Sequence, residues 1–65
     1  MNLLAWFRRP STDDREVRAE IWRLGNRHHG WPLEGALSEL EDPDLSAEHA
    51  QLLRACVRKL KAQPA

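Results

Sequence analysis

The longest amphipathic stretch of the chain runs from Ser46 to Lys61 and contains neither glycine nor proline. At about 100° per residue, its apolar positions and His49 fall within one arc, while most of its basic residues occupy the opposite side. Ser46 is a favourable N-cap residue, and basic residues near Lys61 suit the carbonyl end of a helix. The pattern therefore predicts a helix over 46–61 with one face turned toward a core.

A second helix is predicted over 12–28, upstream of the first. Val17, Ile21 and Leu24 recur at helical spacing on one stripe. A proline followed by Ser, Thr and Asp precedes this stripe, which is typical of a helix start.

A short third helix is predicted between these two, over 32–41. Gly30 suits the left-handed residue that follows a helix, and Pro32 suits the first turn of the next one. Trp31, between them, is expected to pack the turn against the core. The residues expected to face inward are Leu33, Leu37 and Leu40, with Ala36 beside them.

These elements predict an all-α, three-helix domain over 11–62 with a short middle helix, an apolar N-terminal arm over 1–10 and a frayed tail over 63–65. A domain of this size buries only about 60% of the surface that its unfolded chain exposes. Four large aromatic residues exceed what so thin a core can cover. Self-association is therefore expected, with a dimer favoured.

The N-terminal arm carries Leu3, Leu4, Trp6 and Phe7, followed by two arginines. Three interpretations are open. The arm covers the core of its own chain or of a partner subunit, or it lies on a membrane surface as an amphipathic foot, or it docks into a groove of another protein.

Charge and composition narrow the classes of function. Ten basic and ten acidic residues give a net charge of zero, so no overall field attracts nucleic acid or an anionic membrane. No stretch approaches the roughly 20 apolar residues of a membrane span, and a cytoplasmic location is expected. The abundance of Arg, Ala and Leu indicates a bacterial or phage coding sequence.

Trp22 is a large apolar residue outside the apolar face of the predicted helix over 12–28. It lies well away from the apolar stripe, near Arg15 and Arg18. A tryptophan flanked by arginines is typical of the centre of a protein interface. In the competing interpretation, the N-terminal arm folds over it.

Candidate chemistry is limited to His28, His29, His49 and Cys56. Their spacing matches no zinc-ligand pattern. Seven residues along a helix separate His49 from Cys56 by roughly 10 Å, which is too far for a catalytic pair. No metal, cofactor or catalytic activity is predicted. Instead, His28 and His49 are expected to be half-buried and bonded to backbone or to each other, and Cys56 to be a buried apolar residue.

A nucleic-acid-binding regulator is the alternative function. Residues 33–40 and 46–61 could form a helix-turn-helix, but acidic residues in 41–44 and the zero net charge disfavour it. The basic residues available on the last helix are Arg54, Arg58, Lys59 and Lys61.

The function predicted first is a small non-catalytic protein–protein interaction module, an adaptor or inhibitor, that docks on another protein through an aromatic helical surface. A peripheral membrane protein anchored by the arm is the remaining alternative. The residues expected to contact the partner are Trp6, Phe7, Trp22 and Trp31, with Arg15 and Arg18 as the polar rim.

Overall fold

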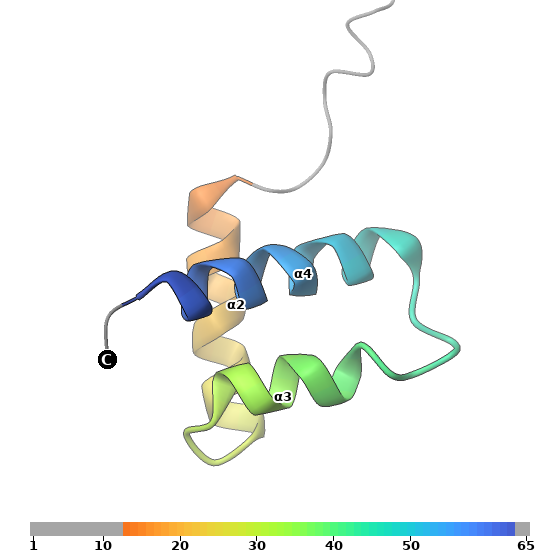
Figure 1. Ribbon diagram of the computed structural model, residues 1–65, viewed down its shortest axis with the longest axis horizontal. Helices are drawn as coiled ribbons and strands as arrows, with labels where there is room; N and C mark the ends of the chain where they lie inside the picture. Colours follow the sequence, from red (N-terminus) through yellow and green to blue (C-terminus); the bar gives the residue numbers. More distant parts are fainter. Residues whose placement is uncertain (1–12, 64–65) are drawn as a thin grey trace, which may run out of the picture.

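The computed structural model describes residues 13–63, which form helices α2 (Asp14–Arg27), α3 (Pro32–Glu39) and α4 (Ala47–Ala62). Figure 1 shows α3 and α4 side by side and running in nearly opposite directions, with α2 crossing behind them. Each helix contacts the other two. The prediction of an all-α, three-helix domain is confirmed, and every predicted helix boundary lies within two residues of the observed one. The N-terminal arm, including Trp6 and Phe7, lies outside the described residues.

Local capping explains where two of the helices begin. The Asp13 side chain accepts a hydrogen bond from the backbone N–H of Arg15 at 3.2 Å. The hydroxyl of Ser46 accepts one from the N–H of His49 at 3.1 Å. These side chains satisfy N–H groups that have no partner inside a helix. Helix α3 has no such cap and starts on Pro32, whose missing N–H needs no partner.

The turn between α2 and α3 contains two consecutive left-handed residues. Gly30 has a φ of 88°, as its position after a helix predicts, and His29 has a φ of 56°. Trp31 follows as the N-cap residue of α3, and it is 63% exposed. The prediction that Trp31 packs against the core is therefore wrong, because the N-cap position lies outside the inward face of α3.

The core lies where the three helices meet. Leu24 of α2, Leu53 and Cys56 of α4 and Ala36 of α3 are fully buried. Helix α3 contributes mainly small residues, so it can pack closely on its neighbours. Leu37 is 43% exposed, which corrects the prediction that it faces inward. The remaining apolar residues of the core and its edge are Val17, Ala55, Ile21, Leu40, Leu45, Leu52 and Val57.

Candidate functional site

The outer face of α2 presents Trp22 to solvent. The residue is 71% exposed, and Arg15 and Arg18 are exposed on the same side of the helix, seven and four residues earlier. Arg18 forms an ion pair with Asp14 at 3.5 Å, and the amide of Asn26 donates a hydrogen bond to the carbonyl of Trp22 at 3.2 Å. No side chain of the described residues buries the indole.

Glu20 is the buried charged residue of the described part of the chain, with only 3% of its surface exposed. Its Oε1 accepts from Arg23 Nε at 3.0 Å and forms an ion pair with Nη2 at 2.9 Å. Its Oε2 accepts from Arg27 Nη2 at 3.1 Å. Both oxygens therefore have charged donors, as a buried carboxylate requires.

Arg27 joins α2 to α3. Its Nε and Nη2 each donate to one oxygen of Glu39 at 3.0 Å, in the two-pronged geometry that guanidinium and carboxylate groups favour. These hydrogen bonds, followed by those to Glu20, raise the pKa of Arg27 above its ordinary value. Burial raises the pKa of Glu39, but hydrogen bonds from Arg27 and His28 outweigh it, so its pKa lies below the usual range. Glu39 is therefore ionised at neutral pH.

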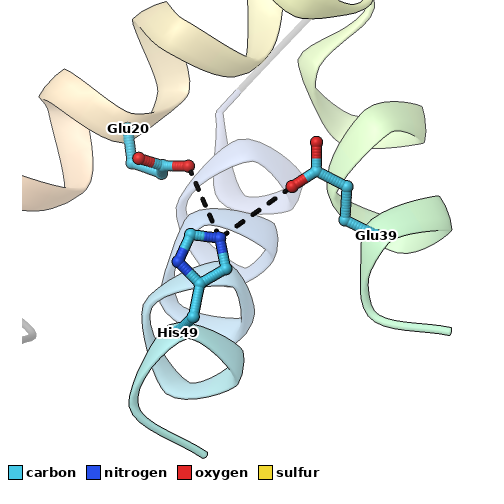
Figure 2. A group of neighbouring side chains, drawn as sticks. All are labelled: Glu20, Glu39 and His49. Carbon is cyan, nitrogen blue, oxygen red and sulfur yellow. Dashed lines mark ion pairs between the residues drawn. The ribbon is translucent and has the colours of Figure 1, made fainter. Parts of the chain in front are cut away.

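The two histidines near this network face carboxylates. His28 Nε2 donates to Glu39 Oε2 at 2.7 Å. His49, from α4, points its Nε2 between Glu20 and Glu39, 3.9 Å from the nearer oxygen of each (Figure 2). The prediction that His28 and His49 bond to backbone or to each other is therefore wrong. The reason is that both acids lie on inward faces, where a histidine can reach them.

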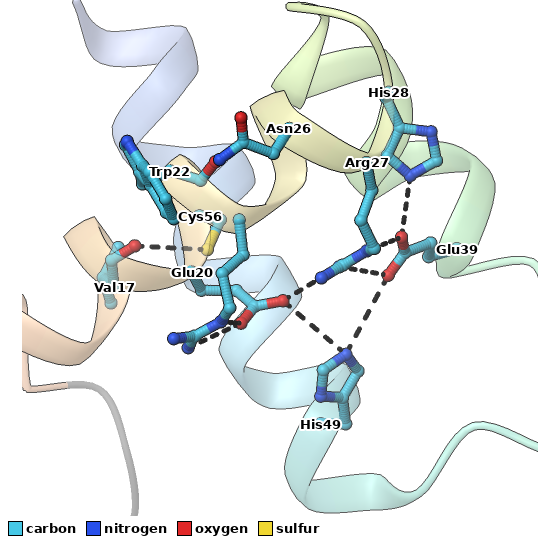
Figure 3. Close-up of polar contacts among 10 residues, drawn as sticks. Val17, Glu20, Trp22, Asn26, Arg27, His28, Glu39, His49 and Cys56 are labelled. Atoms are coloured by element: carbon cyan, nitrogen blue, oxygen red, sulfur yellow. Dashed lines mark hydrogen bonds and ion pairs between the residues drawn. The ribbon is translucent and has the colours of Figure 1, made fainter.

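Glu20, Glu39 and His49 are also the described residues best placed to hold a metal ion, because their ligand atoms lie within 4.8 Å of one another. Carboxylate oxygen and imidazole nitrogen are ligands that zinc accepts. However, Arg27 Nη2 already bonds the same oxygens of Glu20 and Glu39 that face His49 (Figure 3). A guanidinium therefore balances the charge at this point, and the geometry is that of an ion-pair network joining three helices.

Cys56 offers no nucleophile. Its thiol is fully buried and donates to the carbonyl oxygen of Val17 at 3.7 Å. Burial, with a smaller contribution from the charge of Glu20, raises its pKa to about 11. At neutral pH it is a neutral thiol inside the core, as the sequence predicts for a buried apolar cysteine.

Gly35 allows the close approach of the His28 ring. A Cβ added at Gly35 would lie 2.9 Å from His28 Nε2 and closer still to two ring carbons. The sequence indicates only that Gly35 weakens a short helix. In the fold, it makes room for the histidine that bonds Glu39.

We therefore expect the effect of Gly35→Ala on the free energy of unfolding to change sign with residue 28. In the wild type, the new methyl group displaces the His28 ring and breaks its bond to Glu39, which costs more than the roughly 1 kcal/mol of helix propensity that alanine adds. In a His28→Ala background, the same change should stabilise the protein by up to about 1 kcal/mol. Urea denaturation of the four proteins measures both values, and equal effects in the two backgrounds would contradict the assigned contact.

The basic residues of α4 are divided between two environments. Arg54, Arg58 and Lys61 are exposed, and no ion pair involves them among residues 13–63. Lys59 is half-buried and pairs with Asp14 at 3.1 Å, so it belongs to the contact between α4 and α2. The nearly antiparallel α3 and α4 in Figure 1 differ from the crossing of about 90–120° in a helix-turn-helix.

Sequence reasoning missed Glu20, Arg27 and Glu39. The available signal was position: Glu20 lies three residues after Val17 and four before Leu24, on the apolar stripe of α2. An acid at such a position requires partners, and arginines three and seven residues later can supply them.

Within residues 13–63, no helix is long and apolar enough to cross a membrane. No family model matches this chain, and neither a curated protein nor a solved structure does.

Proposed function

We propose that this chain is a small, non-catalytic protein–protein interaction module, a cytoplasmic adaptor or inhibitor, that docks on another protein through Trp22 and Trp31. Arg15 and Arg18 form the polar rim of that surface. The observation that carries the proposal is the exposure of the two tryptophans, 71% and 63%.

The exposed tryptophans provide a large gain of free energy on docking. A tryptophan buries roughly 150–250 Å² when it is covered. At about 25 cal/mol per Å², this corresponds to several kcal/mol per indole. The indole N–H adds a donor that orients a partner, which is why tryptophan is common at the centres of interfaces.

The polar groups inside the fold support a role without catalysis. Cys56 is buried with a raised pKa, and Glu20 and Glu39 are engaged by arginines. Their contacts join helices, which is a structural role.

A nucleic-acid-binding regulator is the second candidate, and the exposed Arg54, Arg58 and Lys61 favour it. Such binding weakens steeply as salt rises. Docking through indoles depends much less on salt, so the salt dependence of partner binding separates the two candidates.

Photo-crosslinking tests the aromatic surface directly. A photoreactive residue at position 22, at position 31, or at the exposed control position Ala62 should be irradiated in extract of the host cell. We expect the same crosslinked protein from positions 22 and 31 and not from position 62. Failure of both tryptophan positions to give a common protein would contradict the proposal.

A further inference from the structure

Trp22 lies between two small residues on the outer face of α2. At about 100° per residue, the helix positions within about 60° of Trp22 include neither an acid nor a second large apolar residue. These positions are Arg15, Arg18, Ala19, Gly25 and Asn26. Ala19 is three residues before Trp22 and Gly25 is three residues after it, so they border the indole on its two sides. Because the indole is 71% exposed, it projects from the helix where a partner can enclose it.

Gly25 is not required by the fold itself. A Cβ added at this position would have no atom of the described residues within 4 Å beyond its own stretch of helix. Its φ is not positive, unlike that of Gly30, and no side chain occupies its space, unlike Gly35, which makes room for His28. Glycine inside a helix is nevertheless less favourable than most other residues. The missing side chain leaves open a place beside Trp22 where a group from another molecule can approach the helix closely.

The charge around Trp22 is positive. Arg15 is exposed and forms no ion pair with any residue that the structure describes. Arg18 pairs with Asp14 at 3.5 Å, but the two side chains are 65% and 61% exposed, and such a pair contributes little. Glu16 lies about 120° around the helix from Trp22. A partner that covers Trp22 therefore meets two guanidinium groups, which bond carboxylates in a two-pronged geometry.

We propose, building on the proposed function, that Trp22 docks on an acidic segment of a partner protein. Carboxylates of this segment bond Arg15 and Arg18, and an apolar side chain of the segment packs against the indole over Gly25. The arginines precede Trp22 by seven and four residues. The carboxylates are therefore expected about 10 and 6 Å from the apolar side chain, measured along α2.

Single-stranded nucleic acid also combines aromatic and basic contacts, but it fits this face less well. Such binding uses a basic groove that follows the backbone over several nucleotides. The face around Trp22 offers two arginines, and Asp14 and Glu16 border them on the same helix. Their negative charge repels a phosphate backbone that extends past the arginines.

Selection of peptides by phage display tests the chemistry of the partner. A library of random peptides should be selected on the full chain, and those that do not bind Trp22→Ala should be sequenced. We expect them to be rich in Asp and Glu and to contain Leu, Ile or Phe. An Arg15→Glu, Arg18→Glu variant should bind them at least about tenfold more weakly. Gly25→Gln should weaken binding by at least about tenfold too, yet melt at or above the wild-type temperature, because glutamine favours a helix.

Arg54→Glu with Arg58→Glu is the matched control, because it makes the same change of net charge on the exposed face of α4 and should bind the peptides as the wild type does. Thermal melts verify that each variant is folded. Neutral or basic peptides, an equal loss of binding in the control, or wild-type binding by Gly25→Gln would overturn the inference. Trp22-dependent binding of random-sequence single-stranded RNA, without enrichment of peptides, would overturn it as well. These outcomes leave the proposed function standing, which fails instead if positions 22 and 31 crosslink no common protein.

Discussion

Replacing Glu20 with alanine is expected to lower the free energy of unfolding by about 2–3 kcal/mol. The side chain is 4% exposed and accepts from both Arg23 and Arg27. Its removal leaves a gap in the core and two arginines that have lost a partner. These arginines are 50% and 41% exposed, so water can take over part of their solvation, which keeps the loss below the larger values seen for fully buried pairs.

At roughly 4–8 °C per kcal/mol for a domain of this size, the Glu20→Ala melting temperature should fall by about 10–20 °C. Glu16→Ala is the matched control: it removes the same side chain one turn earlier on α2, from an exposed position, and should melt close to the wild type. Thermal melts followed by circular dichroism compare the two. Equal melting temperatures for Glu20→Ala and Glu16→Ala would show that the network adds no net stability.

Leu53→Ala is expected to lower the free energy of unfolding by at least as much, about 2–5 kcal/mol. Leu53 is fully buried among the three helices, and the fold cannot collapse around the cavity without moving α4. A chain of this length has a total stability of only about 3–10 kcal/mol, so much of the variant should be unfolded at 37 °C.

Leu37→Ala provides the control for Leu53→Ala, because it deletes the same atoms from a residue that is 43% exposed. It should cost less than about 1 kcal/mol. Urea denaturation of both variants tests the assignment of the core. If Leu37→Ala lowered the free energy of unfolding more than Leu53→Ala, α3 would have to be rotated so that Leu37 faces the core.

The helices could be predicted from the sequence because local signals agree with periodic ones. Asp13, Ser46 and Pro32 mark helix starts, and the stripe through Val17 and Leu24 faces the core as expected. The rotation of α3 was predicted only in part: Ala36 and Leu40 face the core as expected, but Leu37 does not. Its leucines suggest one inward face, but packing selects the small Gly35 and Ala36 so that the helices can approach closely.

Most contacts of the ion-pair network could not be predicted from the sequence. Glu39 and Arg27 are twelve residues apart and on different helices, so neither periodicity nor i,i+4 spacing indicates their contact. The sequence places His49 on the apolar face of its helix. Its position near Glu20 depends on how α2 crosses α4, which the sequence does not indicate. By contrast, the exposure of Trp22 follows from its angle to the apolar stripe, which needs no tertiary information.

The proposed docking surface is tested most directly by a Trp22→Ala, Trp31→Ala double variant, assayed for both stability and partner capture. Because both side chains are largely exposed, the free energy of unfolding should change by less than about 1 kcal/mol, while the protein crosslinked from positions 22 and 31 is no longer retained. An Arg54→Ala variant should retain it. If the folded double variant still retained the crosslinked protein, the account would be contradicted. A large loss of stability would also contradict it, because the two indoles would then be needed for folding.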